Sequence, residues 1–304
     1  MFDVLLENEQ GITVNINDSV RYEVIHISGL NPIPATLYTS KSPNRKGAKY
    51  NGSSMDVRNV VIDIKLLGDI EESRNYLYSW VDTEAYCKIR FKNASKNIYC
   101  EGYVVECQID MFSDNEVVSV AVQCPDIYLK DLQEVATVIS HNDSEFSFPF
   151  SIEQKEVMEY TTTIPDDAVV IGTFNRGMAF STIKDSVITR VYNVGTTTGM
   201  IIEAICKDDV DNLEIFDGKD VQRKIAFKYH FPKGSTIVID TESNPKKARA
   251  TLTDGTIVNL MKHIVGTPTW LTLKKGENSI GHRSDSGYVT YSLTVKHTNK
   301  YLGI

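Results

Sequence analysis

Residues 58–81 read RNVVIDIKLLGDIEESRNYLYSWV and combine two kinds of hydrophobic periodicity. The first half alternates apolar side chains with a second, mixed set, which is the period-2 pattern of a strand with one buried face. The buried set is predicted to be Val60, Ile62, Ile64 and Leu66. Gly68 interrupts the run, so the strand is predicted to end before it.

A helix is predicted to begin directly after this strand. Asp69, followed three residues later by Glu72, has the spacing of a capping box, in which each carboxylate accepts from a backbone N–H of the first turn. An apolar stripe at helical spacing then continues to Val81. It consists of Ile70, Leu77 and Val81, with Tyr76 and Trp80 beside them. Residues 71–75, including Ser73, are predicted to face water, and nearly all of the remaining chain is predicted to be strand.

Length and composition indicate two globular domains. A chain of 304 residues is long for one hydrophobic core, and its 41% hydrophobic content is that of an ordinary globular protein. We expect a first domain over residues 1–135 and a second over residues 144–304. The boundary is expected in the polar stretch that ends at residues 141–144.

The charge balance argues against several classes of partner. The 32 Lys and Arg against 40 Asp and Glu give a formal net charge of −8, so the chain as a whole offers no basic field to nucleic acid or to an anionic membrane. No apolar run approaches the ~20 residues that span a bilayer, and residues 1–3 open an acidic amphipathic segment, unlike a signal peptide. These features predict a soluble protein made in a cytosol, with no membrane partner.

The first domain is predicted to be an antiparallel sheet system with one helix packed on it. Its strands are expected in a hairpin over residues 4–16 and over residues 22–27, 35–39, 60–67, 87–92, 98–110 and 116–124. Between Ser40 and Asp56 the composition shifts to Ser, Asn, Gly, Lys and Arg without an apolar period, which predicts a long exposed loop. Its basic residues could dock on an acidic partner, although a solvated loop is the commoner meaning of such a run.

From Phe146 onward, short alternating runs recur at fairly even intervals without a helical period. The predicted strands span residues 169–174, 186–193, 200–206, 212–216, 223–231, 235–241, 248–253, 256–261, 270–273 and 288–297. Asp217-Gly218 and Asp254-Gly255 are direct hairpin signals. A succession of strands with such turns predicts a β-sandwich.

No strong catalytic or metal-binding pattern is present. The six histidines, His26, His141, His230, His263, His282 and His297, never occur at i, i+2 or i, i+4 spacing. The five cysteines, Cys87, Cys100, Cys107, Cys124 and Cys206, include no C-x-x-C pair, which predicts buried, reduced thiols in strands. The G-x-S-x-G elbow, the Walker loop and the Rossmann glycine run are also missing. We therefore predict no enzyme, no cofactor and no metal, and assign no catalytic or ligand-binding residue.

Weaker signals favour structural roles. The cluster D-D-V-D-N over residues 208–212 carries the carboxylates that calcium prefers, but Leu213 and Glu214 do not fit the EF-hand loop, so a solvated loop is predicted. Trp80 and Trp270 could stack on sugar rings, but core packing is predicted for each. A pair of carboxylates for glycoside hydrolysis needs proximity only in space, so the 40 acidic residues leave such a pair unidentified.

Several short motifs follow one another along the chain. They are YEVIHISGLNPIP over residues 22–34, a lysine-rich loop ending at Gly52, Arg58 with the strand after it, GDI over 68–70 with residues 74–77, FPF over 148–150, Asn193 with GTT over 195–197, KGENSI over 275–280 and YLGI over 301–304. In this order the chain resembles the distal tail proteins of long-tailed phages that infect Gram-positive bacteria, over nearly its full length. Two departures affect only turns: Lys275 stands in place of Pro, and the loop before Gly52 lacks Asp-Gly.

The resemblance implies a fold and a place in a larger assembly. The first domain would be a sandwich or barrel similar to tail-tube subunits, with a packed helix, and the second a galectin-like β-sandwich that projects outward. Six copies would form a ring in the virion that joins the tail tube to the tail tip or baseplate, after assembly in the bacterial host cytoplasm. The implied partners are the chain itself, the tail tube protein, the tail tip or tail-associated protein, the tape-measure protein and receptor-binding proteins.

Further sequence features fit this picture without requiring it. An acidic channel would let DNA pass as cargo without adhering, because basic contacts to phosphate add attraction. Ring closure would also pair the edge strands of neighbouring sheets. Two other function classes stay open, a carbohydrate-binding module or lectin-like protein and a cell-wall hydrolase.

Overall fold

The computed structural model describes residues 3–42, 46–109, 116–139, 187–286 and 290–304. This part of the chain is almost entirely β, with one α-helix, α1 (Ile70–Tyr78), and one 3-10 turn, η1 (Leu260–His263). The predicted all-β fold with one helix is confirmed. The predicted strand over residues 169–174, the expected boundary at 141–144 and the motif at 148–150 lie outside the described residues.

The first sheet is antiparallel and contains nine strands. Its main path runs through β2 (Thr13–Asn15), β1 (Asp3–Glu7), β7 (Tyr86–Lys92), β8 (Asn97–Ile109), β9 (Val117–Cys124), β6 (Arg58–Leu66) and β3 (Tyr22–Ser28). In addition, β10 (Leu129–Asp131) pairs with β8, and β23 (Lys300–Tyr301) pairs with β10. The two ends of the path, β2 and β3, do not pair with each other, so the described strands do not close into a barrel.

The predicted strand-to-helix segment lies next to the edge of this sheet that β3 forms. The four alternating apolar residues of β6 are fully buried, while its neighbours β9 and β3 supply hydrogen bonds on both sides. Gly68 has a φ of +66°, a left-handed conformation that turns the chain out of the strand. Asp69 caps α1, because its Oδ1 accepts from the backbone N of Glu72 at 3.1 Å. Leu77 and Val81 are buried in the core, as predicted.

Two details of the helix prediction are wrong. Glu72 does not complete the capping box with its side chain; its Oε1 accepts from Nη2 of Arg21 at 2.8 Å. Ser73 is buried, because it lies one turn before Leu77 on the same helix face. Its hydroxyl donates to the carbonyl of Leu67 at 3.0 Å, and its own carbonyl accepts from the Tyr22 hydroxyl at 2.8 Å.

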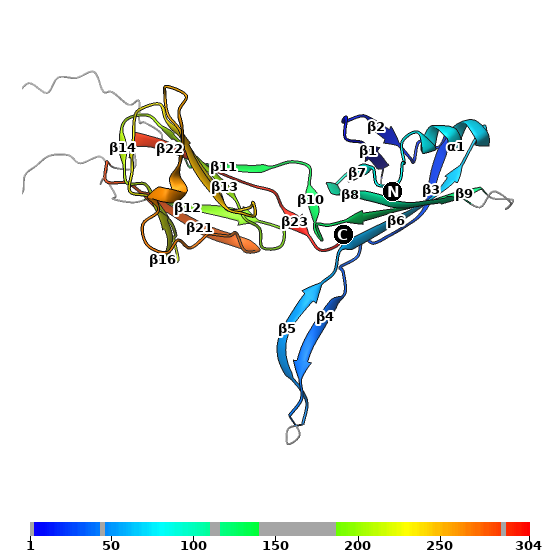
Figure 1. Ribbon diagram of the computed structural model, residues 1–304, viewed down its shortest axis with the longest axis horizontal. Coiled ribbons are helices and arrows are strands. Elements are labelled where there is room, and N and C mark those ends of the chain that lie inside the picture. The colour runs from blue at the N-terminus through cyan, green and yellow to red at the C-terminus, as the bar shows by residue number, and fades with distance from the viewer. Residues whose placement is uncertain (1–2, 43–45, 110–115, 140–186, 287–289) are drawn as a thin grey trace, which may run out of the picture.

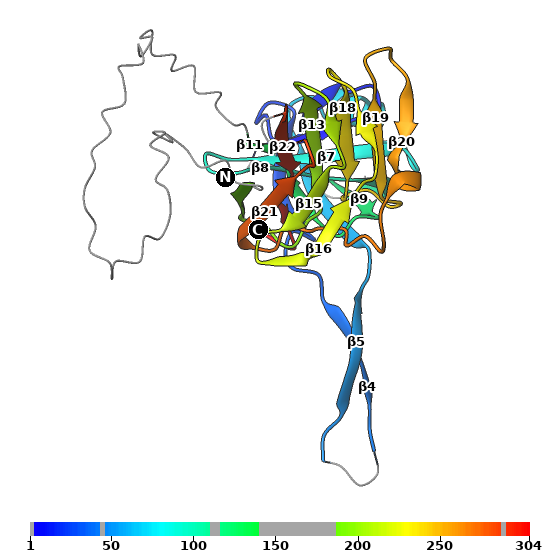
Figure 2. The same ribbon diagram turned by 90° about the vertical axis from the view of Figure 1, so that its left-hand side faces the viewer.

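The second unit is a sandwich of a six-stranded and a four-stranded antiparallel sheet, as predicted. Figure 2 shows the two layers. The six-stranded sheet contains β11 (Val135–Ile139), β22 (Tyr291–His297), β13 (Ile201–Cys206), β18 (Thr236–Asp240), β19 (Lys247–Thr251) and β20 (Ile257–Asn259). The four-stranded sheet contains β12 (Val187–Asn193), β21 (Gly276–Arg283), β15 (Glu214–Asp217) and β16 (Asp220–Ala226). A short pair, β14 (Val210–Asp211) and β17 (His230–Phe231), completes it.

Three strand predictions in the sandwich are wrong. Residues 270–273 form no strand, and only Leu273 makes an isolated bridge, to Thr198. The single strand predicted over 223–231 is divided into β16 and β17. Conversely, residues 276–283 form β21, which pairs with both β12 and β15. Its two glycines and its polar residues give β21 no strand-like hydrophobic pattern in the sequence. Gly281 is nevertheless required, since a Cβ there would lie 2.2 Å from the ring of Phe216.

Within the described residues, the chain crosses between the two units twice. The first crossing leads from β10 to β11, and the second from β22 to β23 at the C-terminus. Tyr301 and Ile304 therefore pack against the hydrophobic core of the first sheet. Figure 1 shows the two units at opposite ends of an elongated molecule, with the crossing segments between them.

Candidate functional site

In the part of the chain that the structure describes, the acidic and histidine side chains form no recognisable catalytic or metal centre. Within the described ranges, no group of three or more His, Cys, Asp and Glu residues is placed to hold a metal. In the 208–212 cluster, residues 210–211 form β14, and Oδ1 of Asp211 lies 2.8 Å from Nδ1 of His230. Ser286 Oγ donates to the same carboxylate at 3.2 Å. This serine contacts the acid and not the imidazole, so the trio lacks the order needed to activate a nucleophile.

The cysteines have the environment of structural thiols. All five are free, and four are buried in strands, as predicted, with Cys107 half-buried. Burial raises the pKa of Cys87 to about 12 and that of Cys206 to about 11. Thiolate, the reactive form, is therefore scarce at neutral pH at Cys87 and Cys206.

Neither tryptophan is presented as a sugar-stacking platform. Trp80 packs against the core of the first sheet and Trp270 against the core of the sandwich, each half-buried, as predicted. On the outer face of strands β13, β18, β19 and β22, the positions are aliphatic, hydroxyl-bearing or charged, and none is aromatic. These observations give no support to the lectin-like reading based on Trp270.

The most prominent exposed feature is a hairpin of β4 (Ala35–Ser40) and β5 (Lys49–Met55). Part of the predicted loop over residues 40–56 is therefore a strand, because six residues of β5 pair with β4, with Asn51 left out at a bulge. In Figures 1 and 2 the hairpin projects well away from the first sheet and contacts no other layer. All of β4 and nearly all of β5 is exposed.

The hairpin exposes apolar side chains as well as positive charge. Leu37 is 62% exposed and Tyr50 60% exposed, and Tyr38 and Met55 are exposed as well. Every charged residue between positions 35 and 55 is basic; they are Lys41, Arg45, Lys46 and Lys49. A two-stranded hairpin without a core is marginally stable by itself. The combination is typical of a surface that is covered in an assembly.

The edge of the first sheet is a second exposed surface, besides the hairpin. Among the described residues, β6 is the only strand that pairs with β3, so the other side of β3 is an edge of the sheet. On that side the N–H of Val24 donates to Asn17 Oδ1 at 3.2 Å and the carbonyl of Tyr22 accepts from the N–H of Ser19 at 3.1 Å. Ile25 on this strand is also exposed. The hairpin and the β3 edge belong to the same unit, since β4 follows β3 along the chain.

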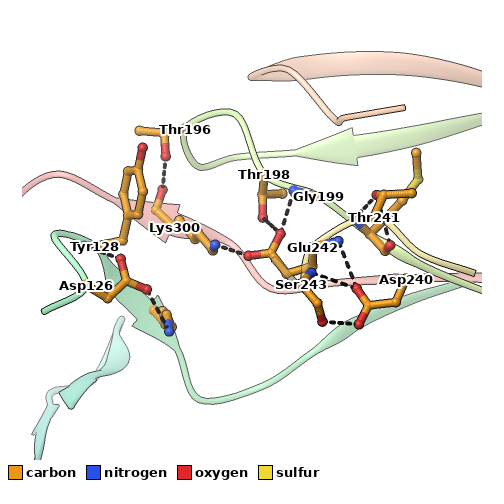
Figure 3. Close-up of polar contacts among 12 residues, drawn as sticks. Asp126, Tyr128, Thr196, Thr198, Gly199, Asp240, Thr241, Glu242, Ser243 and Lys300 are labelled. Carbon is orange, nitrogen blue, oxygen red and sulfur yellow. Dashed lines mark hydrogen bonds and ion pairs between the residues drawn. The ribbon is translucent and has the colours of Figure 1, made fainter. Parts of the chain in front are cut away.

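A polar network joins the two units where the chain crosses between them (Figure 3). Lys300 of β23 forms an ion pair with Glu242 of the sandwich, and its ammonium lies 5.4 Å from the ring centroid of Tyr128. Glu242 also accepts from the backbone N of Gly199 at 2.6 Å and from Oγ1 of Thr198 at 3.1 Å. Burial raises the pKa of Glu242, but the Lys300 ammonium and these donors outweigh burial and hold it below its usual range.

Arg58 fixes the far end of the second crossing. It is fully buried at the start of β6, and its guanidinium donates to Ile127 O through Nε at 2.9 Å and to Leu302 O through Nη2 at 2.7 Å. Nη1 donates to the carbonyls of Gly29 and Asn31. One side chain thus ties together the turn after β3, the segment before β10 and the C-terminus.

His297 makes the junction sensitive to pH. It is buried at the end of β22, opposite Val135 of β11, and burial lowers the pKa of its imidazole below the ordinary value. A lowered pKa in the folded state means that the unfolded chain binds the proton more readily, so stability is lost as pH falls below about 6.5. We expect the unfolding temperature to drop by about 2 °C or more between about pH 7.5 and about pH 5.5. The drop should shrink in His297→Phe; an unchanged drop in that variant would contradict this role.

The chain was compared with protein families, curated sequences and solved structures. Residues 195–301 match the family described as siphovirus-type tail component, C-terminal domain. The predicted resemblance to phage distal tail proteins is confirmed. No curated protein sequence matches the chain. None of the helices in the described ranges is long and apolar enough to span a membrane.

The chain is similar in fold to the phage SPP1 Dit protein (gp 19.1). Its crystal structure, presented as a paradigm of hub adsorption apparatus in Gram-positive infecting phages, aligns over 98% of both chains with a TM-score of 0.65 and 13% identity. The phage P2 baseplate in its activated conformation with Ca covers all of both chains at 10% identity and a TM-score of 0.45. Its structure with Sr covers 98% of both, at 10% identity and a TM-score of 0.43.

Sequence reasoning missed the hairpin and the role of the C-terminus. The exposed strand β5 lacks the hydrophobic alternation by which a strand with a buried face is recognised, since its sequence K-Y-N-G-S-S-M is mostly polar. The pairing of β23 with β10 joins residues about 170 positions apart, so no local sequence pattern predicts it.

Proposed function

We propose that this protein is the distal tail hub of a siphophage or of a related tail-derived particle. Six copies form a ring through their first domains, residues 1–135, and the second domains, residues 144–304, project outward. The ring joins the tail tube to the tail tip or baseplate and its receptor-binding proteins, with the tape-measure protein and DNA passing through the centre. Support comes from the family match over residues 195–301 and from the fold shared with SPP1 Dit.

The projecting hairpin is the observation that carries the proposal. A second copy is a suitable cover, because the hairpin carries four basic and no acidic residues. The rest of residues 1–135 carries 9 basic against 20 acidic residues. The positive hairpin of one copy and the negative remainder of the first domain of the next copy are therefore complementary in charge. If every copy makes this heterologous contact with the next, and the rotation between neighbours closes on itself, the result is a ring. The open edge of β3 offers a second contact in the same unit.

Surface substitutions on the hairpin test the ring without disturbing the fold. We expect Leu37→Asp combined with Tyr50→Asp to weaken self-assembly by about a hundredfold or more, because both side chains would lose apolar contacts with the neighbour. Sedimentation velocity and negative-stain microscopy measure the assembly state. Circular dichroism should stay unchanged, since both residues are exposed in a single chain.

A matched control sits on the sandwich. Ile257→Asp combined with Val265→Asp changes two residues that are 67% and 54% exposed and should leave assembly unaffected. A wild-type chain that stays monomeric at high concentration would contradict the ring. Rings of unchanged stability in the hairpin variant would contradict the hairpin's part in it.

A further inference from the structure

The net charge of −8 is unevenly divided along the chain. Residues 187–304 carry 16 Lys and Arg against 12 Asp and Glu, whereas residues 1–186 carry 16 against 28. The sandwich therefore has a net positive charge, although the net charge of the whole chain is negative. A basic surface raises the local concentration of anions.

Part of this positive charge surrounds a cavity of about 240 Å3 in the sandwich. The cavity lies where the β15–β16 turn, the segment 271–275 and the start of β21 meet. Leu271 and Ile280, both buried, contribute apolar lining, and Thr272 and Ser279 contribute hydroxyls. The basic residues on its lining are Lys219, Arg223, Lys274 and Lys275.

The acidic residues of the lining are already engaged. Asp217 pairs with Arg223 at 2.7 Å, and Glu277 pairs with Arg190, outside the cavity, at 3.5 Å. The three lysines have no carboxylate partner within the described ranges. Three ammonium groups are therefore left to attract a ligand of opposite charge.

Two of these lysines are carried by a fixed turn. Asn278 accepts from the backbone N of Lys274 at 2.8 Å and donates to the carbonyls of Lys274 and Gly276 at 2.7 and 3.0 Å. Ordering the turn in advance lowers the entropy cost of binding.

We propose that the cavity binds a phosphodiester unit of an anionic polymer on the host cell surface. Ammonium groups bind phosphate as point charges, and the one guanidinium, which would suit a carboxylate, is occupied by Asp217. The hydroxyls of Thr272 and Ser279 complement a polyol, and the volume suits one charged unit, below the ~300–1,000 Å3 of pockets for drug-sized ligands. The location at the host surface rests on the proposed function, and six weak sites on one ring would act together on a long polymer.

Binding of the full chain to poly(glycerol phosphate) tests the site. Dextran of equal length serves as a neutral polymer and poly-glutamate as an acidic peptide. We expect Lys274→Gln combined with Lys275→Gln to weaken binding of poly(glycerol phosphate) about tenfold or more. The matched control is Lys233→Gln combined with Lys262→Gln, which removes two exposed lysines elsewhere on the sandwich and should change affinity less than about twofold.

Several results would overturn the assignment. Equal losses in the two variants would mean diffuse attraction by net charge, and equal binding of dextran would mean a neutral sugar site. Stronger binding of poly-glutamate would mean a site for an acidic protein. Sedimentation of the same samples separates this proposal from the ring: a monomer that binds the polymer contradicts only the ring, and a ring that does not bind contradicts only the site.

Discussion

Replacing Arg58 by methionine is expected to lower the free energy of unfolding by about 3 kcal/mol or more. The guanidinium is fully buried and donates to the four carbonyls of Gly29, Asn31, Ile127 and Leu302. Methionine has a similar length but no donor, so buried acceptors lose their partners, and each such loss costs about 1–3 kcal/mol. The C-terminus should detach at the same time, because Leu302 O is one of the four acceptors.

Chemical denaturation and limited proteolysis near the C-terminus measure the two effects. Arg58→Lys should be intermediate, since one ammonium cannot reproduce the planar fork of donors. Arg74→Met, on the partly exposed face of α1, should change stability by less than about 0.5 kcal/mol. A stability loss for Arg58→Met no larger than that of the Arg74 control would contradict the assigned role.

The contacts of Arg58 explain why scattered motifs occur together in the sequence. Gly29 and Asn31 belong to the motif over residues 22–34, and Leu302 belongs to the motif over 301–304, yet all three meet on one guanidinium. Gly303 packs against Pro32, where a Cβ would lie 2.5 Å from the proline ring. Gly29 has a φ of +85° and approaches the Asn59 carbonyl so closely that no Cβ fits. These two motifs are weak as local sequence because their residues are held together by tertiary contacts.

Local patterns therefore predicted what local physics decides. The alternation in β6 and the Asp69 cap depend on neighbouring residues, and both are present as predicted. The hairpin could not be found in this way, since β5 has no buried face to impose a hydrophobic period. The cavity lined by Lys274 and Lys275 was also invisible, because it is assembled from three segments that only the fold brings together.

Replacing Leu77 by aspartate is expected to abolish folding of the first unit. Leu77 is completely buried on the face of α1 that covers the sheet, beside the four apolar residues of β6. Truncating a buried leucine costs about 2–5 kcal/mol, and an unpaired carboxylate in the same place adds the cost of burying a charge. The total reaches or exceeds the roughly 5–15 kcal/mol that stabilises a typical domain.

Glu71→Lys is the matched control, because Glu71 lies on the same helix and is exposed. It reverses a charge in the first turn, where the helix dipole favours acids, so stability should fall by only about 0.3–1 kcal/mol. Calorimetry should show the transition of the first sheet missing in Leu77→Asp and present in Glu71→Lys, with a sandwich transition in both, because the sandwich has its own core. If Leu77→Asp kept both transitions, α1 would be a surface addition to the first sheet and not part of its core.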